Sequence, residues 1–346
     1  MNQHPERPQV KISFPAGLIA VVPYLLGFTP QASLVVIGVS PRRGRVKLAF
    51  RYDLPDPPDP AGAGAIAGHA FGVLARHRIA FAVVIGYGPG PLVTPLADAV
   101  RAASARTGVS LRDVLRVQEG RYWSYLCGDP SCCPVGGVPV HAADHPAVQA
   151  MTAAGAQALP GREALAATLA PVTGPDAWAM ARATRRAERD AAGMAAAAEG
   201  LHVLDREGLS AVQAAITAYR NGQTVSRSKH AWLSVVLTRL PVRDDAWARM
   251  DPAHRQAHAR LWTDLVRCAQ PGYIAAPASL LAFTAWQSGN GALANIALDR
   301  ALADTPGYSM AELIRQAVSA GLPPSAARPP MTPEQVAASY AGRTDD

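Results

Sequence analysis

The chain has 346 residues, 49% hydrophobic and 17% charged, which is enough apolar material for one large or two ordinary globular domains and excludes a chain disordered throughout. Its net charge of +7 comes almost wholly from arginine, because the only lysines are Lys11, Lys47 and Lys229. The arginines are scattered and lack interleaved stacking aromatics, so nucleic-acid binding is not expected.

The first apolar run extends from Ile12 to Phe28, and Pro15 and Pro23 interrupt it. It has no small-residue cleavage site and a second apolar segment follows at once, so we do not expect a secretory signal. No stretch reaches the roughly 18 uninterrupted apolar residues that a membrane helix needs. We therefore expect a cytoplasmic protein with reduced thiols and no membrane association.

Strand and helix signals alternate from residue 16 to residue 118. Gly27 is expected to end the first helix in a left-handed cap, and the first two strands should pair as an antiparallel hairpin. The pair Thr94-Pro95 is a good N-cap and first-turn signal for the third helix. This alternation is typical of an α/β sheet. The expected elements are helix 16–26, strand 33–39, a turn at 42–44, strand 46–54, helix 63–78, strand 79–85, helix 94–107 and strand 109–118.

Past Val140 the strand signals stop, and an alanine-rich helical pattern runs to the end of the chain. One helix is expected over residues 228–240. Residues 280–306 reproduce the spacing of one tetratricopeptide unit, in which small residues let two antiparallel helices approach closely. Since only one clear copy is present, we expect this pair to belong to a larger helical core. Thr332-Pro333, with Gln335 in capping-box position, should open a last short helix.

These signals predict an α/β N-terminal domain, a mixed sheet with flanking helices, over residues 1–150. An all-α C-terminal domain with the tetratricopeptide-like helix pair should follow over residues 151–321. Residues 322–346 are expected to form a proline-rich linker, a short helix and a flexible tail.

The first candidate site is a short strand that starts at Arg121. Alternation along it places Arg121, Trp123 and Tyr125 on one face. An arginine beside two aromatic faces can serve as a platform for a planar or anionic ligand. The alternative is an arginine that covers an aromatic core.

Two further groups of candidate ligand-binding residues lie near the ends of strands. Arg51 and Asp53 share a face of the second strand, where they form either a local ion pair or part of a pocket with Arg121. Tyr87 lies in a glycine-rich turn at the carboxyl end of a strand, where α/β proteins bind phosphates. Pro89 and Pro91 lack the amide donors of a phosphate cradle, so a plain turn is the first interpretation there.

Cys127, Cys132 and Cys133 fall in one tight turn. Thiolates at this spacing can bind one metal ion, and His141 or His145 could complete a structural zinc site, although the spacing is that of no standard zinc finger. A redox or nucleophilic thiol and small buried packing residues are the alternatives. No serine triad, phosphate-binding Walker loop or pair of catalytic carboxylates can be picked out, so the catalytic residues, if any, are unknown.

Taken together, several segments resemble the actinobacterial domain of unknown function 4192 family. The resemblance spans most of the chain, includes the three clustered cysteines and does not extend to His141 or His145. It implies an actinobacterial, cytoplasmic protein and supplies no activity, cofactor or substrate. The segments are Pro23-Tyr24-Leu25-Leu26-Gly27-Phe28, Ser33-Leu34-Val35-Val36, Arg51-Tyr52-Asp53-Leu54-Pro55, Gly120-Arg121-Tyr122-Trp123-Ser124-Tyr125 with the cysteine turn, and residues 280–306.

The first functional hypothesis is a non-catalytic regulatory protein that binds a small molecule or a protein partner, with self-association left open. The alternative is an enzyme that uses the Cys127, Cys132 and Cys133 cluster as thiolate or metal ligands. In that enzyme Arg121 would hold an anion and Asp53 would act as acid or base.

Overall fold

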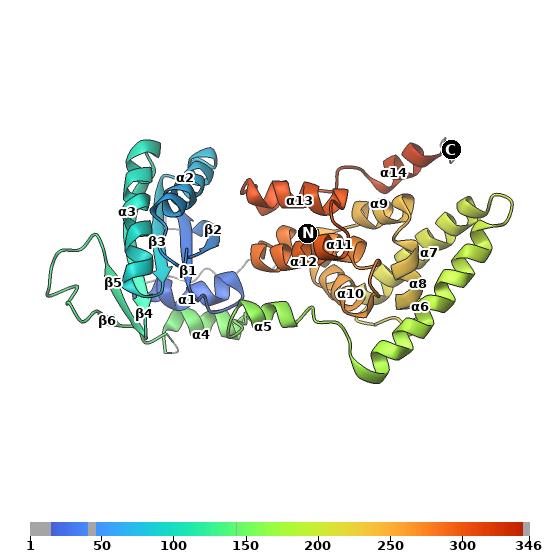
Figure 1. Cartoon of the computed structure of the whole chain (residues 1–346), viewed down its shortest axis with the longest axis horizontal. Helices are drawn as coiled ribbons and strands as arrows, with labels where there is room; N and C mark the ends of the chain where they lie inside the picture. The colour runs from blue at the N-terminus through green and yellow to red at the C-terminus, as the bar shows by residue number, and fades with distance from the viewer. Residues whose placement is uncertain (1–14, 41–45, 143, 342–346) are drawn as a thin grey trace, which may run out of the picture. The chain divides into compact units, whose positions relative to one another are not determined.

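The computed structural model describes residues 15–40, 46–142 and 144–341 (Figure 1). The chain divides into two compact units, Met1–Leu165 and Ala166–Asp346, each with its own buried apolar side chains. The expected turn at 42–44 and the end of the expected tail lie outside the described residues.

Among the described residues, the first unit contains a six-stranded sheet; it is a mixed sheet, as the sequence predicts, and its last strand was not expected. β3 and β4 are parallel, and all other neighbouring strands are antiparallel, including the expected pair β1 and β2. The strand order is β2-β1-β3-β4-β5-β6. The bounds are β1 Ser33–Val39, β2 Val46–Asp53, β3 Phe81–Tyr87, β4 Ser110–Gln118, β5 Arg121–Ser124 and β6 Val138–Pro139.

Two helices, α2 (Pro60–Arg76) and α3 (Gly90–Thr107), cover one face of this sheet (Figure 1). α2 begins at Asp59, whose carboxylate accepts hydrogen bonds from the first free backbone N–H groups. Fully buried side chains of both helices pack on the strands, and each contributes about 1.5–3 kcal/mol through loss of apolar surface. They include Phe71, Leu74, Leu96 and Val100, which lie against Leu34, Val36, Val84 and Val114 of the sheet.

The remaining helices of this unit are α1 (Ala16–Leu26) and α4 (Pro146–Ala153), and the division between the two units falls within α5 (Arg162–Ala167). Gly27 ends α1 with φ of 82°, which confirms the predicted left-handed cap. α1 packs against α4, and the following Phe28 forms a bridge to Leu159. The segment after β6 therefore closes back on the start of the sheet.

The expected start of α3 at Thr94-Pro95 is wrong, because the helix already begins at Gly90. Pro89 is extended, with φ −67° and ψ 152°, and Pro91 occupies the first turn, where a missing N–H costs no hydrogen bond. Pro95 then lies inside the helix. The short connection brings β3 and α3 so close that a Cβ on Gly86 would lie 2.3 Å from Val93.

Within its described residues, the second unit contains helices and no strand, as predicted. α11 is its central helix, buried from Ala275 to Trp286, and it packs against α12, the second half of the predicted tetratricopeptide-like pair. The helices are α6 Gly174–Ala195, α7 Gly200–Arg220, α8 Arg227–Val236, α9 Leu240–Ala248, α10 Arg255–Cys268, α11 Ala275–Gln287, α12 Gly291–Asp304, α13 Ser309–Ser319 and α14 Pro333–Tyr340, with short 3-10 turns at Pro252–His254 and Pro324–Ala326.

The predicted helix over 228–240 is too long. α8 ends at Val236 and Leu240 begins α9, because Arg239 is extended, with ψ of 124°, and Pro241 starts the new helix. The capping box of Thr332 and Gln335 at the start of α14 is confirmed. Among the described helices, none combines the length and the apolar character that a membrane crossing requires.

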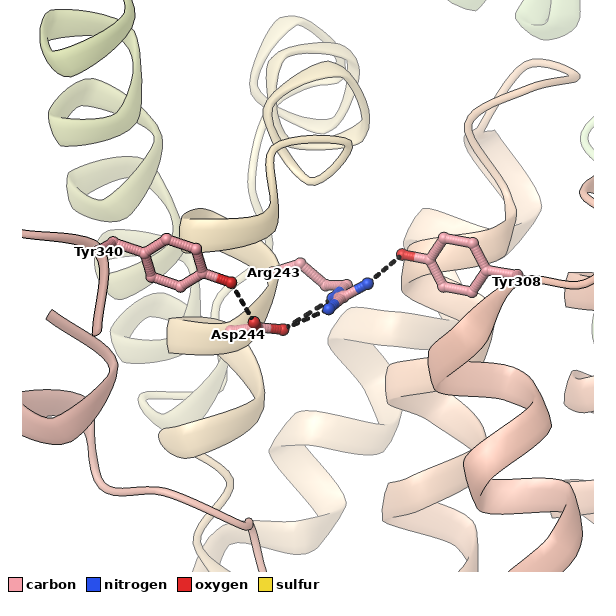
Figure 2. Close-up of polar contacts among 4 residues, drawn as sticks. All are labelled: Arg243, Asp244, Tyr308 and Tyr340. Carbon is pink, nitrogen blue, oxygen red and sulfur yellow. Dashed lines mark hydrogen bonds and ion pairs between the residues drawn. The ribbon is translucent and has the colours of Figure 1, made fainter. Parts of the chain in front are cut away.

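A cluster of four polar side chains ties α14 to the rest of this unit (Figure 2). Asp244 of α9 accepts hydrogen bonds from Tyr340 Oη at 2.7 Å and from Arg243 Nη2 at 2.6 Å. Arg243 Nη1 also donates to Tyr308 Oη at 3.4 Å. Arg243 and Asp244 are nearly buried, with 10% and 13% of their side chains exposed, so their charges are neutralised within the protein.

Candidate functional site

An open groove of about 620 Å³ lies where the carboxyl ends of the parallel strands β3 and β4 meet the start of α3. Its volume falls in the range of small-molecule sites. No acidic side chain is among its described lining residues. These are Pro89, Gly90, Pro91, Thr94, Arg116, Gln118, Trp123, Ser124 and Tyr125.

Arg116 is the charged residue of the groove. It stands opposite Trp123 in the β4–β5 register, and its guanidinium carbon lies 3.7 Å from the centre of the indole ring. Nη1 donates to Gln118 Oε1 at 2.8 Å. The same nitrogen would lie 3.6 Å from a Cβ on Gly90, so the cation stands beside the positively polarised start of α3. Stacking on indole holds a guanidinium in place while its edge donors stay directed outward.

Of the predicted platform, Trp123 and Tyr125 line the groove and Arg121 does not. Tyr125 Oη shares a hydrogen bond of 2.9 Å with Thr94 Oγ1 of α3. Arg121 donates instead to two backbone carbonyls of the following loop, from Nε to Gly136 at 2.6 Å and from Nη2 to Gly137 at 2.9 Å. Arg121 therefore holds the loop that leads into β6.

Trp123 also contacts that loop. Its Nε1 donates to the carbonyl of Val135 at 2.9 Å, and a Cβ on Gly137 would lie 2.5 Å from the indole. Gly137 has φ of 74°, a conformation that favours glycine. The indole thus lies between Arg116 and the loop, so the position of the loop sets one wall of the groove.

The other predicted ligand residues lie on the opposite face of the sheet. Arg51 is in register with Val35, Ile85, Leu115 and Ser124 across four strands, one row away from the Arg116–Trp123 row, so the two sets point to opposite sides. A shared pocket of Arg51, Asp53 and Arg121 is therefore not formed.

The local ion pair expected for Arg51 and Asp53 is confirmed. Arg51 Nε also donates to Ser33 Oγ at 2.7 Å, while Asp53 is 79% exposed. Tyr87 is nearly buried, burial raises its pKa, and its hydroxyl has no hydrogen-bond partner among the described residues. None of these three side chains lines the groove.

The three clustered cysteines come together in the loop after β5. All are free thiols, and their sulfur atoms lie within 4.8 Å of one another. The backbone N–H of Asp129 donates to Cys127, which lowers the pKa of that thiol. A hydrogen bond with Cys127 is the main cause that raises the pKa of Cys133 to about 12, with burial second. A buried packing role does not fit, because Cys132 is exposed and the other two are only partly covered.

Neither histidine that could complete a zinc site joins this cluster. His145 precedes α4, and its Nδ1 accepts a hydrogen bond from the Ala147 N–H at 3.2 Å. His141 is exposed beyond β6. Among the described residues the group that could bind a metal ion therefore consists of three thiols.

Sequence reasoning missed Arg116 and Thr94. Arg116 had a detectable signal, because Glu119 and Gly120 form a two-residue turn with φ of 49° and 70°. A two-residue turn fixes the hairpin register and places Arg116 opposite Trp123. Thr94 had no such signal, since its role depends on the early start of α3.

The family model described as Domain of unknown function (DUF4192) matches residues 15–325, a span that includes the groove and the thiol cluster. No curated protein and no solved structure was found to match the chain. Because the family model covers well over half of its length, the chain belongs to the DUF4192 family.

Proposed function

We propose that this protein binds a small anionic molecule, with a planar group beside the anion, in the groove at Arg116. The observation that carries the proposal is the position of the Arg116 guanidinium, stacked on Trp123 at 3.7 Å in a groove with no carboxylate among its described lining residues. The Glu119 carboxylate nearby accepts from Gln118 Nε2 at 3.5 Å and is not among the lining residues, so the guanidinium is the charged group that a ligand in the groove would meet.

The chemistry of the groove supports a carboxylate or phosphate ligand. A guanidinium offers five N–H donors in a planar fork that matches both groups. The start of α3 next to Arg116 adds positive potential. The paired hydroxyl groups of Thr94 and Tyr125 can hydrogen-bond the uncharged part of the molecule, and Trp123 offers an aromatic edge to its ring.

The proposal extends to the setting of the protein. We infer a cytoplasmic, actinobacterial protein in which the sheet unit binds the ligand and the helical unit, with its tetratricopeptide-like pair α11 and α12, binds a protein partner. The four free thiols suit a reducing compartment. Regulation by ligand occupancy, without a reaction, is the role that we assign to the groove.

The test is a titration of the full chain with a panel of anions that includes inorganic phosphate, nucleoside monophosphates and aromatic carboxylates. Quenching of tryptophan fluorescence and a thermal shift report binding. Arg116→Gln removes a charge-assisted hydrogen-bond donor and should weaken binding about 10- to 100-fold. The matched control is Arg112→Gln, since Arg112 lies on the same strand and stacks on Phe81 at 4.2 Å, away from the groove.

Equal affinity of Arg116→Gln and the unaltered protein for every anion that binds would remove Arg116 from the site. Absence of binding by the whole panel would contradict the proposed function itself.

The enzyme alternative receives less support from the geometry. Its anion clamp, Arg121, donates to loop carbonyls, and its acid or base, Asp53, lies on the other face of the sheet. We expect any bound anion to be recovered chemically unchanged after prolonged incubation with the protein. A product whose formation is lost in Cys127→Ser or Cys133→Ser would favour the enzyme instead.

A further inference from the structure

We propose that Cys127, Cys132 and Cys133 bind one zinc ion, which fixes the loop from Tyr125 to Gly137 against β5. The proposal is independent of the groove ligand, because it concerns a different set of atoms. It starts from the sulfur atoms of three residues that lie within 4.8 Å of one another in an otherwise solvent-facing loop.

Backbone hydrogen bonds build the site without help from the metal. Ser124 Oγ accepts from the Cys127 N–H at 3.0 Å and donates to Asp113 Oδ1 at 2.6 Å, which anchors the start of the loop to β4. The carbonyl of Asp129 accepts from the N–H groups of Cys132 at 3.2 Å and Cys133 at 2.7 Å. This single turn lets the two adjacent cysteines face Cys127 together.

The Asp129 carboxylate stabilises the same turn. It accepts hydrogen bonds from Ser131 at 2.9 Å through the backbone N–H and at 2.7 Å through Oγ. A turn that is already shaped by such bonds loses little further entropy when three thiolates bind one ion, and this favours tight binding.

Apolar burial does not explain how the loop is held. Val135 is 95% exposed and Leu126 is 42% exposed, although both are large apolar residues. Arg121 and Trp123 hold the end of the loop at residues 135–137, and Ser124 holds its start. The middle of the loop contains the three thiols, so a metal ion would supply the cross-link that a hydrophobic core supplies elsewhere.

The chemistry of the three thiolate ligands determines which metal ions can bind. Thiolates prefer soft or borderline metals such as zinc, copper(I) and iron in iron–sulfur clusters. We choose zinc because a single zinc ion is the simplest centre that three adjacent thiolates can hold, and metal analysis distinguishes it from copper or iron. Zinc–sulfur bonds of about 2.3 Å place tetrahedral sulfur atoms about 3.8 Å apart, which small side-chain rotations reach from the present arrangement.

Three protein ligands leave one position of a tetrahedral zinc ion for water or an outside ligand. The site therefore differs from a structural zinc finger, in which protein side chains occupy all four positions on the ion. We assign it the role of ordering the loop that packs on Trp123.

The test is the zinc content of the full chain purified without chelator, measured by mass spectrometry of the elements. We expect about one zinc per chain in the unaltered protein and less than about a tenth in Cys127→Ser and Cys133→Ser, because a two-thiolate site binds far more weakly. The matched control is Cys268→Ser, since Cys268 ends α10 in the other unit and should leave the zinc content unchanged.

Cobalt(II) provides a second readout. Replacement of zinc by cobalt should produce an intense thiolate-to-cobalt charge-transfer band in the near ultraviolet, and Cys268→Ser should retain it. Stoichiometric copper or iron in place of zinc would overturn the choice of ion. Less than about a tenth of an equivalent of zinc, together with no charge-transfer band or with a disulfide between two of the three cysteines, would overturn the site.

Discussion

In the helical unit, the charged side chains around Asp244 have their partners within the protein, whereas in the sheet unit Arg116 faces a groove whose described lining residues include no carboxylate. Asp205 with Arg239 and Asp245 with Arg249 repeat the internal pairing in the helical unit. A charge that is paired within the protein has no free donors for a ligand, while a charge directed at a groove can bind one. The comparison is consistent with the proposed ligand site in the sheet unit and with a structural role for the cluster of Figure 2.

The strongest test of this comparison is to remove the carboxylate of Asp244. Asp244→Ala leaves the nearly buried Arg243 without its carboxylate and releases Tyr340 of α14, so we expect the free energy of unfolding to fall by about 3–5 kcal/mol. Denaturant unfolding followed by circular dichroism measures the loss.

The matched control is Asp176→Ala, whose partner Arg227 lies at 2.7 Å with both side chains at least half exposed, and it should cost less than about 1 kcal/mol. Equal losses in the two variants would show that the cluster of Figure 2 is no more structural than a surface ion pair.

Acid should lower the free energy of unfolding of the helical unit, and we expect His258 of α10 to be the cause. The side chain is 2% exposed, and burial lowers its pKa from 6.5 to about 4, with Asp251, His254 and Arg220 as the charged neighbours. Between these two values the unfolded chain binds a proton that the folded chain does not. Stability should therefore be intact above pH 6.5 and decline by about 3 kcal/mol as the pH falls toward 4.

Denaturant midpoints followed by tryptophan fluorescence across this pH range measure the effect, since Trp247 and Trp262 report on the helical unit. His258→Gln should flatten the decline. The control is His202→Gln, at an exposed position on α7, which should leave the slope unchanged. A His258→Gln protein with the same pH dependence as the unaltered chain would rule out His258 as the cause.

A substitution with a smaller expected effect tests the groove wall inside the sheet unit. Gly137→Ala puts a methyl group 2.5 Å from the Trp123 ring at a backbone φ of 74°, so we expect a cost of about 1–3 kcal/mol that the loop relieves by moving away from the indole. Faster proteolysis between residues 125 and 137 and stronger acrylamide quenching of tryptophan should follow.

Gly136→Ala is the neighbouring control, because a Cβ there meets nothing within 4 Å. If both variants behave like the unaltered protein, contact between the loop and Trp123 does not set the wall of the groove.

Patterns along a single segment were readable from the sequence. The apolar runs of β1 and β3 predict strands buried on both faces, and both strands form. The Gly27 cap and the Thr332 capping box depend on a few adjacent residues, and both are confirmed. The start of α3 and the end of α8 were misplaced because prolines nearby permit several helix boundaries, and the extended residues Pro89 and Arg239 select among them.

By itself, the sequence determined the order of strands and helices from α1 to β5, the alternation that places Trp123 and Tyr125 on one face, and the grouping of three cysteines in one turn. Only the tertiary structure decided which arginine accompanies those aromatic rings. Arg121 lies next to the loop and donates to its carbonyls, whereas Arg116 reaches Trp123 through the pairing of β4 with β5. The physical reason is that spacing along one segment fixes the face of a side chain, but its partners depend on strand register and on where the next helix begins.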